Sequence, residues 1–224
     1  MCGRFTQTQD LKVLIERFGF TAPDVDLAPR YNIAPGQTAA IVTADAEGGR
    51  ALELLRWGLV PFWAKDEKIG YKLINARGET LHEKPSFRNA LQKRRCLVLA
   101  DGFYEWQKVP GGKQPHYFRL AGGEPFAFAG LWEQWDKGES DEPLRTFTIV
   151  TTTPNELVGP VHDRMPAILS ADAEDAWLDP ALEADAARAL IRSFPAAEMD
   201  SWPVSKAVNS PRTDTPECIE RLSG

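Results

Sequence analysis

The chain has 224 residues, 43% of them hydrophobic and 10% aromatic, so it is long enough to bury a sizeable core and too apolar for intrinsic disorder. Its net charge of −6 argues against a protein that coats nucleic acid nonspecifically, although residues 1–100 carry 15 Lys and Arg against 11 Asp and Glu. No apolar run suits a membrane span or a secretion signal, and three scattered cysteines favour neither disulfides nor a cysteine zinc site. We expect one cytoplasmic domain over residues 1–224.

The first half of the chain mixes short helices and strands with irregular segments. Apolar residues at helical spacing follow Thr8, which is a suitable N-cap. Two apolar runs with strand character flank a Glu-Gly-Gly turn. The predicted elements are a helix over 8–18, strands over 39–43 and 52–59, and a short helix over 86–93 that Ser86 caps.

The second half is richer in strands, which are separated by turns that contain Pro and Gly. We predict strands over 96–100, 103–107, 116–120, 126–132, 146–152 and 165–169, helices over 171–178 and 182–193, and a last strand over 202–208. Short strands at hairpin spacing, with helices that do not alternate with them, predict an α+β fold. We expect a curved, barrel-like antiparallel β-sheet with peripheral helices.

Cys2 is the first residue with distinctive chemistry. Removal of Met1 would place a free α-amine beside its thiol, and an α-amine with an ordinary pKa of about 7.7–8.0 is partly neutral near pH 7. Such an amine condenses with an aldehyde to an imine, and the thiol can then close on the imine carbon to form a thiazolidine. The alternative is that Cys2 is an incidental residue in a frayed terminus.

Three polar residues are candidates for binding or acid–base chemistry. Asn75 follows an apolar strand end, where its amide could hold a hydroxyl or carbonyl group or simply form a turn. Glu105 lies among aromatic residues, so burial would raise its pKa, whereas strict alternation would turn Phe103 and Glu105 outward. His162 is one of three histidines and can transfer protons near neutral pH, or can serve as a cap.

Basic and aromatic residues are interleaved in the first half of the chain, at Arg4, Trp57, Trp63 and Arg77. Grooves for single-stranded nucleic acid combine cationic contacts with aromatic stacking faces. The same pattern arises if Trp57 belongs to the core and Trp63 closes a loop. Composition leaves both interpretations open.

Eight segments in chain order carry a resemblance to one protein family. They are Met1–Phe5, Arg30–Pro35, Trp57–Pro61, Ile74–Arg77, Ala100–Trp106, Ile149–Thr152, His162–Pro166 and Trp202–Ser205. A chain with these segments resembles the SRAP family, the SOS-response-associated peptidases or abasic-site-processing proteins. The resemblance covers residues 1 to about 208, and the tail after Asn209 matches nothing specific.

The resemblance implies a single SRAP domain with an electropositive groove, which senses abasic sites in single-stranded DNA by forming a covalent crosslink. It implies that Cys2 is the crosslinking nucleophile, that Asn75 orients the ring-opened sugar, and that Glu105 and His162 assist proton transfer. The implied DNA contacts are Arg4, Pro35, Trp63, Arg77 and Arg164. Autopeptidase activity that exposes Cys2 and lyase activity at the abasic site are further implications.

The chemistry needs no metal or organic cofactor, and we expect none. The expected partner is single-stranded DNA that contains abasic sites, bound by a monomer with no membrane contact and associated with the nucleoid. The sequence leaves two alternative functions open. One is an N-terminal-nucleophile amidohydrolase of the glutamine amidotransferase type, since such chains also begin Met-Cys-Gly. The other is a noncovalent single-strand binder in which Cys2 is incidental.

Overall fold

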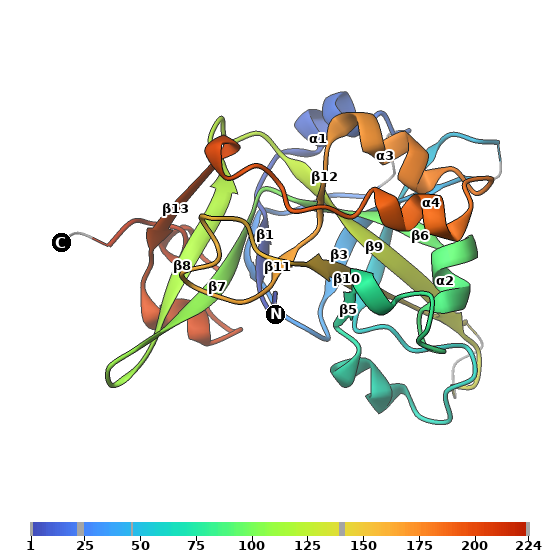
Figure 1. The fold of residues 1–224 in the computed structure, drawn as a ribbon, viewed down its shortest axis with the longest axis horizontal. Helices are drawn as coiled ribbons and strands as arrows, with labels where there is room; N and C mark the ends of the chain where they lie inside the picture. The colour runs from blue at the N-terminus through green and yellow to red at the C-terminus, as the bar shows by residue number, and fades with distance from the viewer. Residues whose placement is uncertain (1, 22–24, 46, 139–141, 223–224) are drawn as a thin grey trace.

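The computed structural model describes residues 2–21, 25–45, 47–138 and 142–222. A five-stranded β-barrel lies at the centre of the fold that these residues form (Figure 1). The barrel strands are β3 (Thr38–Ala44), β4 (Arg50–Trp57), β6 (Arg95–Ala100), β9 (Phe126–Trp135) and β10 (Leu144–Thr152). Their order is β10-β4-β3-β6-β9, and β9 pairs with β10 to close the ring. All pairs in the ring are antiparallel except β10 with β4.

Three short strands extend the barrel on the β9–β10 side. They are β5 (Asn75–Arg77), β11 (Met165–Pro166) and β12 (Ile168–Leu169). The first two lie against β10, β5 parallel and β11 antiparallel, and β12 pairs with β9. The strand predicted over 165–169 is therefore two strands, because the Ala167 carbonyl and amide turn to β9 and β10 respectively.

A second, five-stranded sheet packs against the barrel. Its order is β13 (Met199–Pro203), β8 (Gly112–Leu120), β7 (Gly102–Val109), β1 (Phe5–Gln7) and β2 (Arg30–Ile33), all antiparallel. Phe5, Phe103 and Phe118 from its inner face are fully buried, and the Phe5 ring lies 5.1 Å from Trp57 of the barrel. The N-terminal strand is thus anchored by aromatic packing, which offsets the tendency of a terminus to fray.

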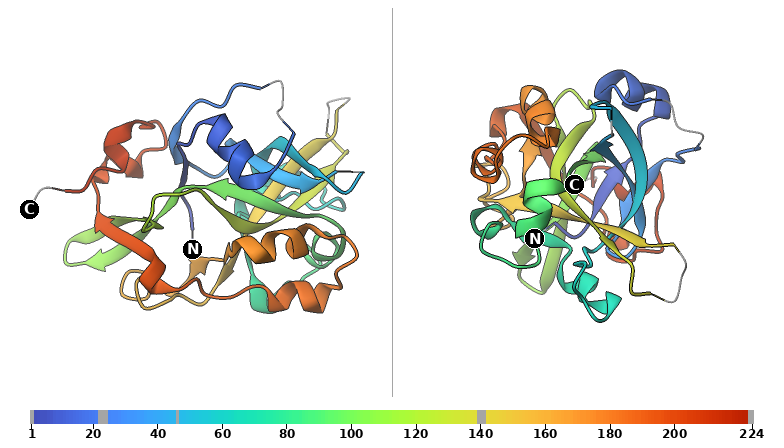
Figure 2. Two further views of the ribbon diagram at one scale, coloured as in Figure 1. Left: turned by 90° about the horizontal axis from the view of Figure 1, so that it is seen from above. Right: turned by 90° about the vertical axis from the view of Figure 1, so that its right-hand side faces the viewer.

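The outer face of this second sheet is covered by the C-terminal segment, residues 204–218. Tyr104 and Tyr117 of the sheet form one buried cluster with Val204, Val208 and Cys218. In Figures 1 and 2 this segment lies beside β7 and β8, at the end of the molecule away from α2 and α4. The first half of β7, residues 102–105, is therefore shielded from water on both faces, whereas its second half toward the hairpin turn is partly exposed.

Short helices surround the barrel (Figure 2). They are α1 (Leu11–Phe18), α2 (Arg88–Lys93), α3 (Ala171–Leu178) and α4 (Ala184–Ala189), with short 3₁₀ helices η1 (Glu67–Lys72), η2 (Gly78–Thr80), η3 (Ala196–Glu198), η4 (Lys206–Asn209) and η5 (Pro216–Cys218). The α+β, barrel-like fold with peripheral helices is confirmed. Within the described ranges, no helix has the length and apolar character needed to cross a membrane.

Several predicted boundaries are wrong for identifiable reasons. Thr8 does not cap α1, because its hydroxyl donates to Asp101 and the helix begins after Asp10. Ser86 does not cap α2, which starts at Arg88 without a side-chain cap. The last strand lies at 199–203, where β13 pairs with β8, while residues 206–209 form a turn of 3₁₀ helix.

Candidate active site around Cys2

Cys2 lies just before β1 and is completely buried. Its thiol donates to the Arg4 carbonyl over 3.6 Å, and its own carbonyl accepts a 2.8 Å hydrogen bond from the Asn75 side-chain amide. Burial, reinforced by the nearby Glu105 carboxylate, raises the pKa of the Cys2 thiol far above its ordinary value. The frayed-terminus alternative is therefore wrong for Cys2, although Met1 itself lies outside the described residues.

Asn75 begins β5 and pairs with Ile149 of β10, which places its side chain against Cys2. Its Nδ2 atom donates to the Cys2 carbonyl, while its buried Oδ1 atom accepts no hydrogen bond from the described residues. A buried acceptor without a donor is costly, and such groups cluster where a ligand or water completes the bonding. Asn75 thus has an acceptor available beside the candidate nucleophile.

Glu105 projects from β7 and is only 1% exposed. Its neighbours Phe103 and Tyr104 are also fully buried, so the expectation of alternate outward-facing residues is wrong here. The physical reason is that segments distant in sequence cover both faces of β7: the Gln107 side chain, on the Glu105 face, donates to the Pro160 carbonyl of the 153–164 loop. Desolvation raises the pKa of Glu105 to about 7.

His162 lies in the loop between β10 and β11, with its Nε2 atom 3.9 Å from Glu105 Oε2. Its Nδ1 atom accepts a 3.1 Å hydrogen bond from the Arg164 backbone amide, which favours the tautomer with the proton on Nε2. Burial lowers the pKa of His162, so the imidazole is neutral at pH 7. Glu105 and His162 therefore form an acid–base pair that can exchange a proton near neutral pH.

Three arginines surround this group. Arg4 donates to the Gly3 carbonyl at 2.8 Å and to the Asn209 carbonyl at 3.4 Å. Arg164 makes a bidentate ion pair with Glu79, at 2.6 and 2.9 Å, which lowers the pKa of Glu79.

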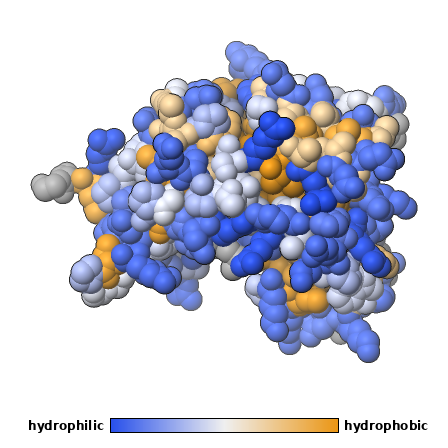
Figure 3. Space-filling model, in the orientation of Figure 1, coloured by the Kyte–Doolittle hydropathy of each residue, from blue (hydrophilic) through white to orange (hydrophobic). Residues whose placement is uncertain are grey.

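Arg77 ends β5 and is exposed, two residues beyond Asn75 on the same face of the strand. Below β1, the molecular outline is indented between the β7–β8 hairpin and the η1 segment (Figure 3).

Pro35 and Trp63 lie on separate loops. Pro35 is half-buried in the turn between β2 and β3, and Trp63 is 41% exposed beside Phe62, which is 48% exposed. The Trp63 indole N–H approaches the Pro85 carbonyl at 3.5 Å. Trp57, in contrast, is a core residue that is 1% exposed, so of the two interpretations that the sequence left open for it, the core interpretation is correct. The structure brings Cys2, Asn75, Glu105 and His162 together, with Pro35 and Trp63 elsewhere on the surface.

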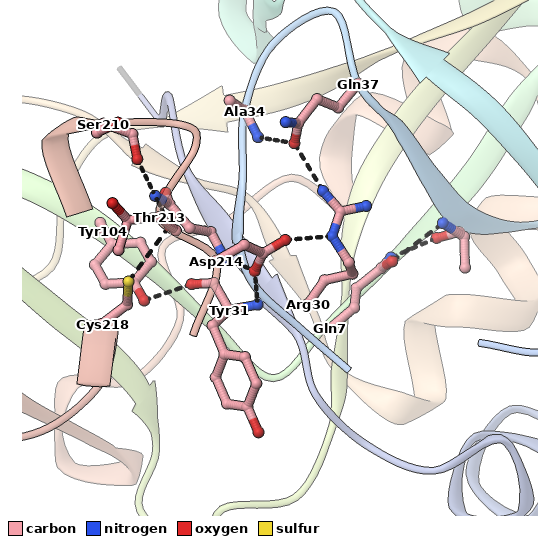
Figure 4. Close-up of polar contacts among 12 residues, drawn as sticks. Gln7, Arg30, Tyr31, Ala34, Gln37, Tyr104, Ser210, Thr213, Asp214 and Cys218 are labelled. Atoms are coloured by element: carbon pink, nitrogen blue, oxygen red, sulfur yellow. Dashed lines mark hydrogen bonds and ion pairs between the residues drawn. The ribbon is translucent and has the colours of Figure 1, made fainter. Parts of the chain in front are cut away.

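Sequence reasoning missed the contribution of the C-terminal segment. The Asn209 side chain accepts a 2.7 Å hydrogen bond from the Trp106 indole, and its carbonyl accepts from Arg4. Asp214 accepts from the backbone amides of Tyr31 and Asn32 (Figure 4). The dense run of turn-forming and capping residues over 209–215 is the one sequence signal that could have indicated such a structured segment.

Among the described residues, no three His, Cys, Asp or Glu side chains are arranged to hold a metal ion. The candidate site is instead assembled from a thiol, an amide, a carboxyl group and an imidazole. These are the groups needed for nucleophilic attack on a carbonyl carbon with proton transfer.

Comparisons with known proteins identify relatives of the chain. The family model of SOS response associated peptidase (SRAP) matches residues 1–211. The abasic site processing protein YoqW of Bacillus subtilis (strain 168) is 47% identical over 224 residues, which cover 98% of this chain and 99% of the relative. The abasic site processing protein HMCES of Gallus gallus is 39% identical and aligns with 85% of this chain and 66% of its own length.

A crystal structure of a protein from Bacteroides thetaiotaomicron has the same fold. It superposes with a TM-score of 0.90 at 28% sequence identity, covering 99% of this chain and 100% of that one. The barrel and the second sheet are therefore shared with a relative whose structure has been determined by X-ray crystallography.

Proposed function

The chain belongs to the SRAP family, and from that premise we propose that it processes abasic sites in single-stranded DNA by forming a covalent bond through Cys2. The observation that carries the proposal is the convergence of Cys2, Asn75, Glu105 and His162 from four separate parts of the chain. Relatives named abasic site processing proteins supply the substrate class.

The reaction begins with hydrolysis of the Met1–Cys2 peptide bond, which frees the Cys2 α-amine. The ring-opened abasic deoxyribose presents an aldehyde at C1′. The amine adds to this carbon, and loss of one water gives an imine. The thiol sulfur then bonds to the same carbon while the thiol proton passes to the nitrogen, which closes a thiazolidine ring and leaves every atom accounted for.

Glu105 and His162 move the protons in these steps. A carboxyl group with a pKa of about 7 both donates and accepts at neutral pH, so Glu105 can protonate the departing hydroxyl and can later take up the thiol proton and pass it to the nitrogen. His162 exchanges protons with Glu105 across their 3.9 Å separation. The free Oδ1 acceptor of Asn75 holds a sugar hydroxyl beside Cys2.

The same groups support two further reactions. Attack of water on the Met1 carbonyl carbon, with Glu105 as the proton donor to the departing Cys2 amine, is autopeptidase chemistry. Proton abstraction from C2′ of the imine, followed by departure of the 3′ phosphate, is lyase chemistry. Closure by the Cys2 thiol competes with this elimination, because the thiazolidine no longer has the imine that activates C2′.

Binding of the DNA strand rests on the cations around the site. Arg4, Arg77 and Arg164 contact phosphates, and Arg164 exchanges part of its ion pair with Glu79 for a phosphate oxygen. Pro35 and the exposed Trp63 ring extend the surface on which bases stack.

The decisive experiment uses protein whose intact mass shows removal of Met1. Incubation with a single-stranded oligonucleotide that contains one abasic site gives an adduct that survives denaturing electrophoresis, with the summed mass of both partners less one water. Cys2→Ala and a chain with one extra residue before Cys2 give no such adduct. Cys218→Ala, which removes another buried thiol, retains it.

Other outcomes favour the alternatives. Normal adduct formation by the extended chain contradicts the role of the α-amine. Glutaminase activity without a DNA adduct indicates an amidohydrolase. Salt-sensitive DNA binding that is unchanged in Cys2→Ala, without any adduct in the unsubstituted protein, indicates a noncovalent binder.

A further inference from the structure

The Asp101 carboxylate is a buried charged group outside the catalytic set. It lies between β6 and β7 and is 4% exposed. Among the described residues, its hydrogen-bond donors come from β1 and the two residues after it: the hydroxyls of Thr6 and Thr8 and the backbone amides of Thr8 and Gln9. A buried carboxylate is stable only when such donors satisfy it, so this arrangement fixes the position of residues 6–9.

Gln7 holds the same segment from the other side. Its side-chain amide donates to the carbonyls of Ala40 and Leu99, at 2.7 and 2.8 Å, and accepts from the Ala40 amide at 3.1 Å. These contacts tie β1 to β3 and β6 of the barrel. The β1 strand has only three residues, which pair with β7 at Phe5 and Thr6 and with β2 at Phe5 and Gln7, and these side-chain contacts add to its anchoring.

The position of Asp101 in the chain gives these contacts a functional consequence. Asp101 directly precedes β7, which carries Glu105, and it binds the residues that follow Cys2 along the N-terminal strand. The carboxylate therefore joins the segment that carries the nucleophile to the strand that carries the acid–base group. A displacement of β1 along β7 would change the distance between Cys2 and Glu105 directly.

We propose that Asp101 is a positioning residue for Cys2, an inference that rests on the proposed crosslinking function. Loss of its hydrogen bonds allows the N-terminal segment to shift relative to β7, so the reacting groups meet in the correct geometry less often. A misplacement of about 1 Å is enough to slow a reaction roughly 100-fold. The contact between Asp101 and residues 6–9 would then influence the reaction rate, although none of these residues touches the sugar.

Tyr117 completes the pocket around this carboxylate. Its hydroxyl lies 3.2 Å from the Thr6 hydroxyl and donates to the Asp101 carbonyl at 3.4 Å. The same hydroxyl occupies the space over Gly102, where an added Cβ atom would lie 2.1 Å from it. Gly102 therefore leaves room for Tyr117 to close the Asp101 pocket.

Asp101→Asn tests the proposal. The amide keeps the size of the side chain but replaces one acceptor oxygen by an NH2 group that cannot accept from Thr8 and Gln9. We expect the single-turnover rate of adduct formation at saturating abasic DNA to fall about 10- to 100-fold. The Kd for a strand with a stable, unreactive abasic analogue should change by less than about twofold, because no proposed phosphate contact is removed.

Glu174→Gln is the matched control. Glu174 is a buried carboxylate, 1% exposed, that pairs with Arg17 and Arg50 on the outside of the barrel. Its substitution also lowers stability, which urea denaturation measures for both variants. At a temperature where both variants are folded, Glu174→Gln should form the adduct at the rate of the unsubstituted protein. If Asp101 only stabilised the fold, folded Asp101→Asn would form the adduct at that same rate.

Thr8→Val provides a milder version of the same change if Asp101→Asn does not fold. It removes one hydroxyl donor to Asp101 and keeps a β-branched side chain, and we expect a slowing of about threefold or more. Adduct formation within twofold of normal in the folded variants, or equal slowing in Glu174→Gln, overturns the positioning role. An unsubstituted protein that forms no adduct overturns the proposed function instead.

Discussion

At the scale of single residues, the site depends on burial. Cys2 and Glu105 are almost completely removed from water, and desolvation raises the pKa of both groups. The neutral forms are therefore favoured: a thiol next to a carboxylic acid, with a neutral imidazole behind them. An uncharged site avoids mutual repulsion between thiolate and carboxylate and keeps a proton available for transfer.

Glu105→Gln should change the pH dependence of stability. The pKa of Glu105 is about 7 in the folded protein and 4.5 ordinarily, so the folded state favours the protonated carboxyl group. The contribution of this group to the free energy of unfolding is therefore fully present below pH 4.5 and is lost as the pH rises through 7. The free energy of unfolding of the unsubstituted protein should fall by up to about 3 kcal/mol more than that of the variant between pH 4.5 and 8.

Urea denaturation at a series of pH values between 4.5 and 8 measures this difference. Glu124→Gln, at an exposed carboxylate, serves as the control and should follow the unsubstituted protein. Equal pH dependence in Glu105→Gln and the unsubstituted protein would show that Glu105 is not destabilised as a carboxylate in the folded state.

At the scale of elements, both ends of the chain converge on the second sheet. The N-terminal strand β1 lies between β7 and β2, and the C-terminal segment binds β2 from outside. Asn32 is fully buried and donates to the carbonyls of Val208, Ser210 and Thr213. Asp214 binds the Arg30 side chain at 2.5 Å (Figure 4). The tail that matched no specific segment in sequence is thus part of the support for β2 and, through Asn209, for Arg4.

Asp214→Ala should loosen the C-terminal segment. It leaves the backbone amides of Tyr31 and Asn32 without their acceptor and removes the ion pair to Arg30. Each unsatisfied buried donor costs about 1–3 kcal/mol, so the free energy of unfolding should fall by at least that amount.

Urea denaturation measures the loss, and limited proteolysis reports cleavage within residues 205–218. Glu220→Ala, at an exposed position just after this segment, should leave both measurements unchanged. Unchanged stability in Asp214→Ala would mean that the segment is held by its apolar contacts alone.

At the scale of the whole molecule, charge is distributed unevenly. The net charge is −6, yet the excess of basic residues lies in residues 1–100, which supply Arg4 and Arg77 beside the site. An acidic protein with local cations discriminates against nonspecific binding, because the rest of its surface repels the DNA backbone. On the face shown in Figure 3, hydrophilic residues predominate and exposed hydrophobic residues form small separate patches.

Arg77→Ala should reduce the salt dependence of DNA binding. Each phosphate contact to single-stranded DNA contributes about −0.7 to the slope of log K against log salt concentration, so the slope should become shallower by about that value. Fluorescence anisotropy with an oligonucleotide at several salt concentrations measures the slope. Lys12→Ala, on α1, removes an exposed cation outside the proposed groove, and an equal change in that variant would exclude a local contact by Arg77.

The sequence by itself determined the local features of this protein. Apolar spacing placed most strands within a few residues, helix α3 has the predicted bounds, and ordered motifs identified the family. These features depend on interactions between near neighbours, which a repeating pattern of side chains records directly.

Only the tertiary structure decided how these elements meet. The parallel pairing of β10 with β5 brings Asn75 to Cys2, and the 153–164 loop brings His162 to Glu105. Alternation along β7 predicted which side chains share a face, but the depth of Glu105 follows from the segments that cover that face. Those segments are distant in sequence. A periodic pattern predicts that one face of a strand is buried, but it does not identify the segment that covers that face.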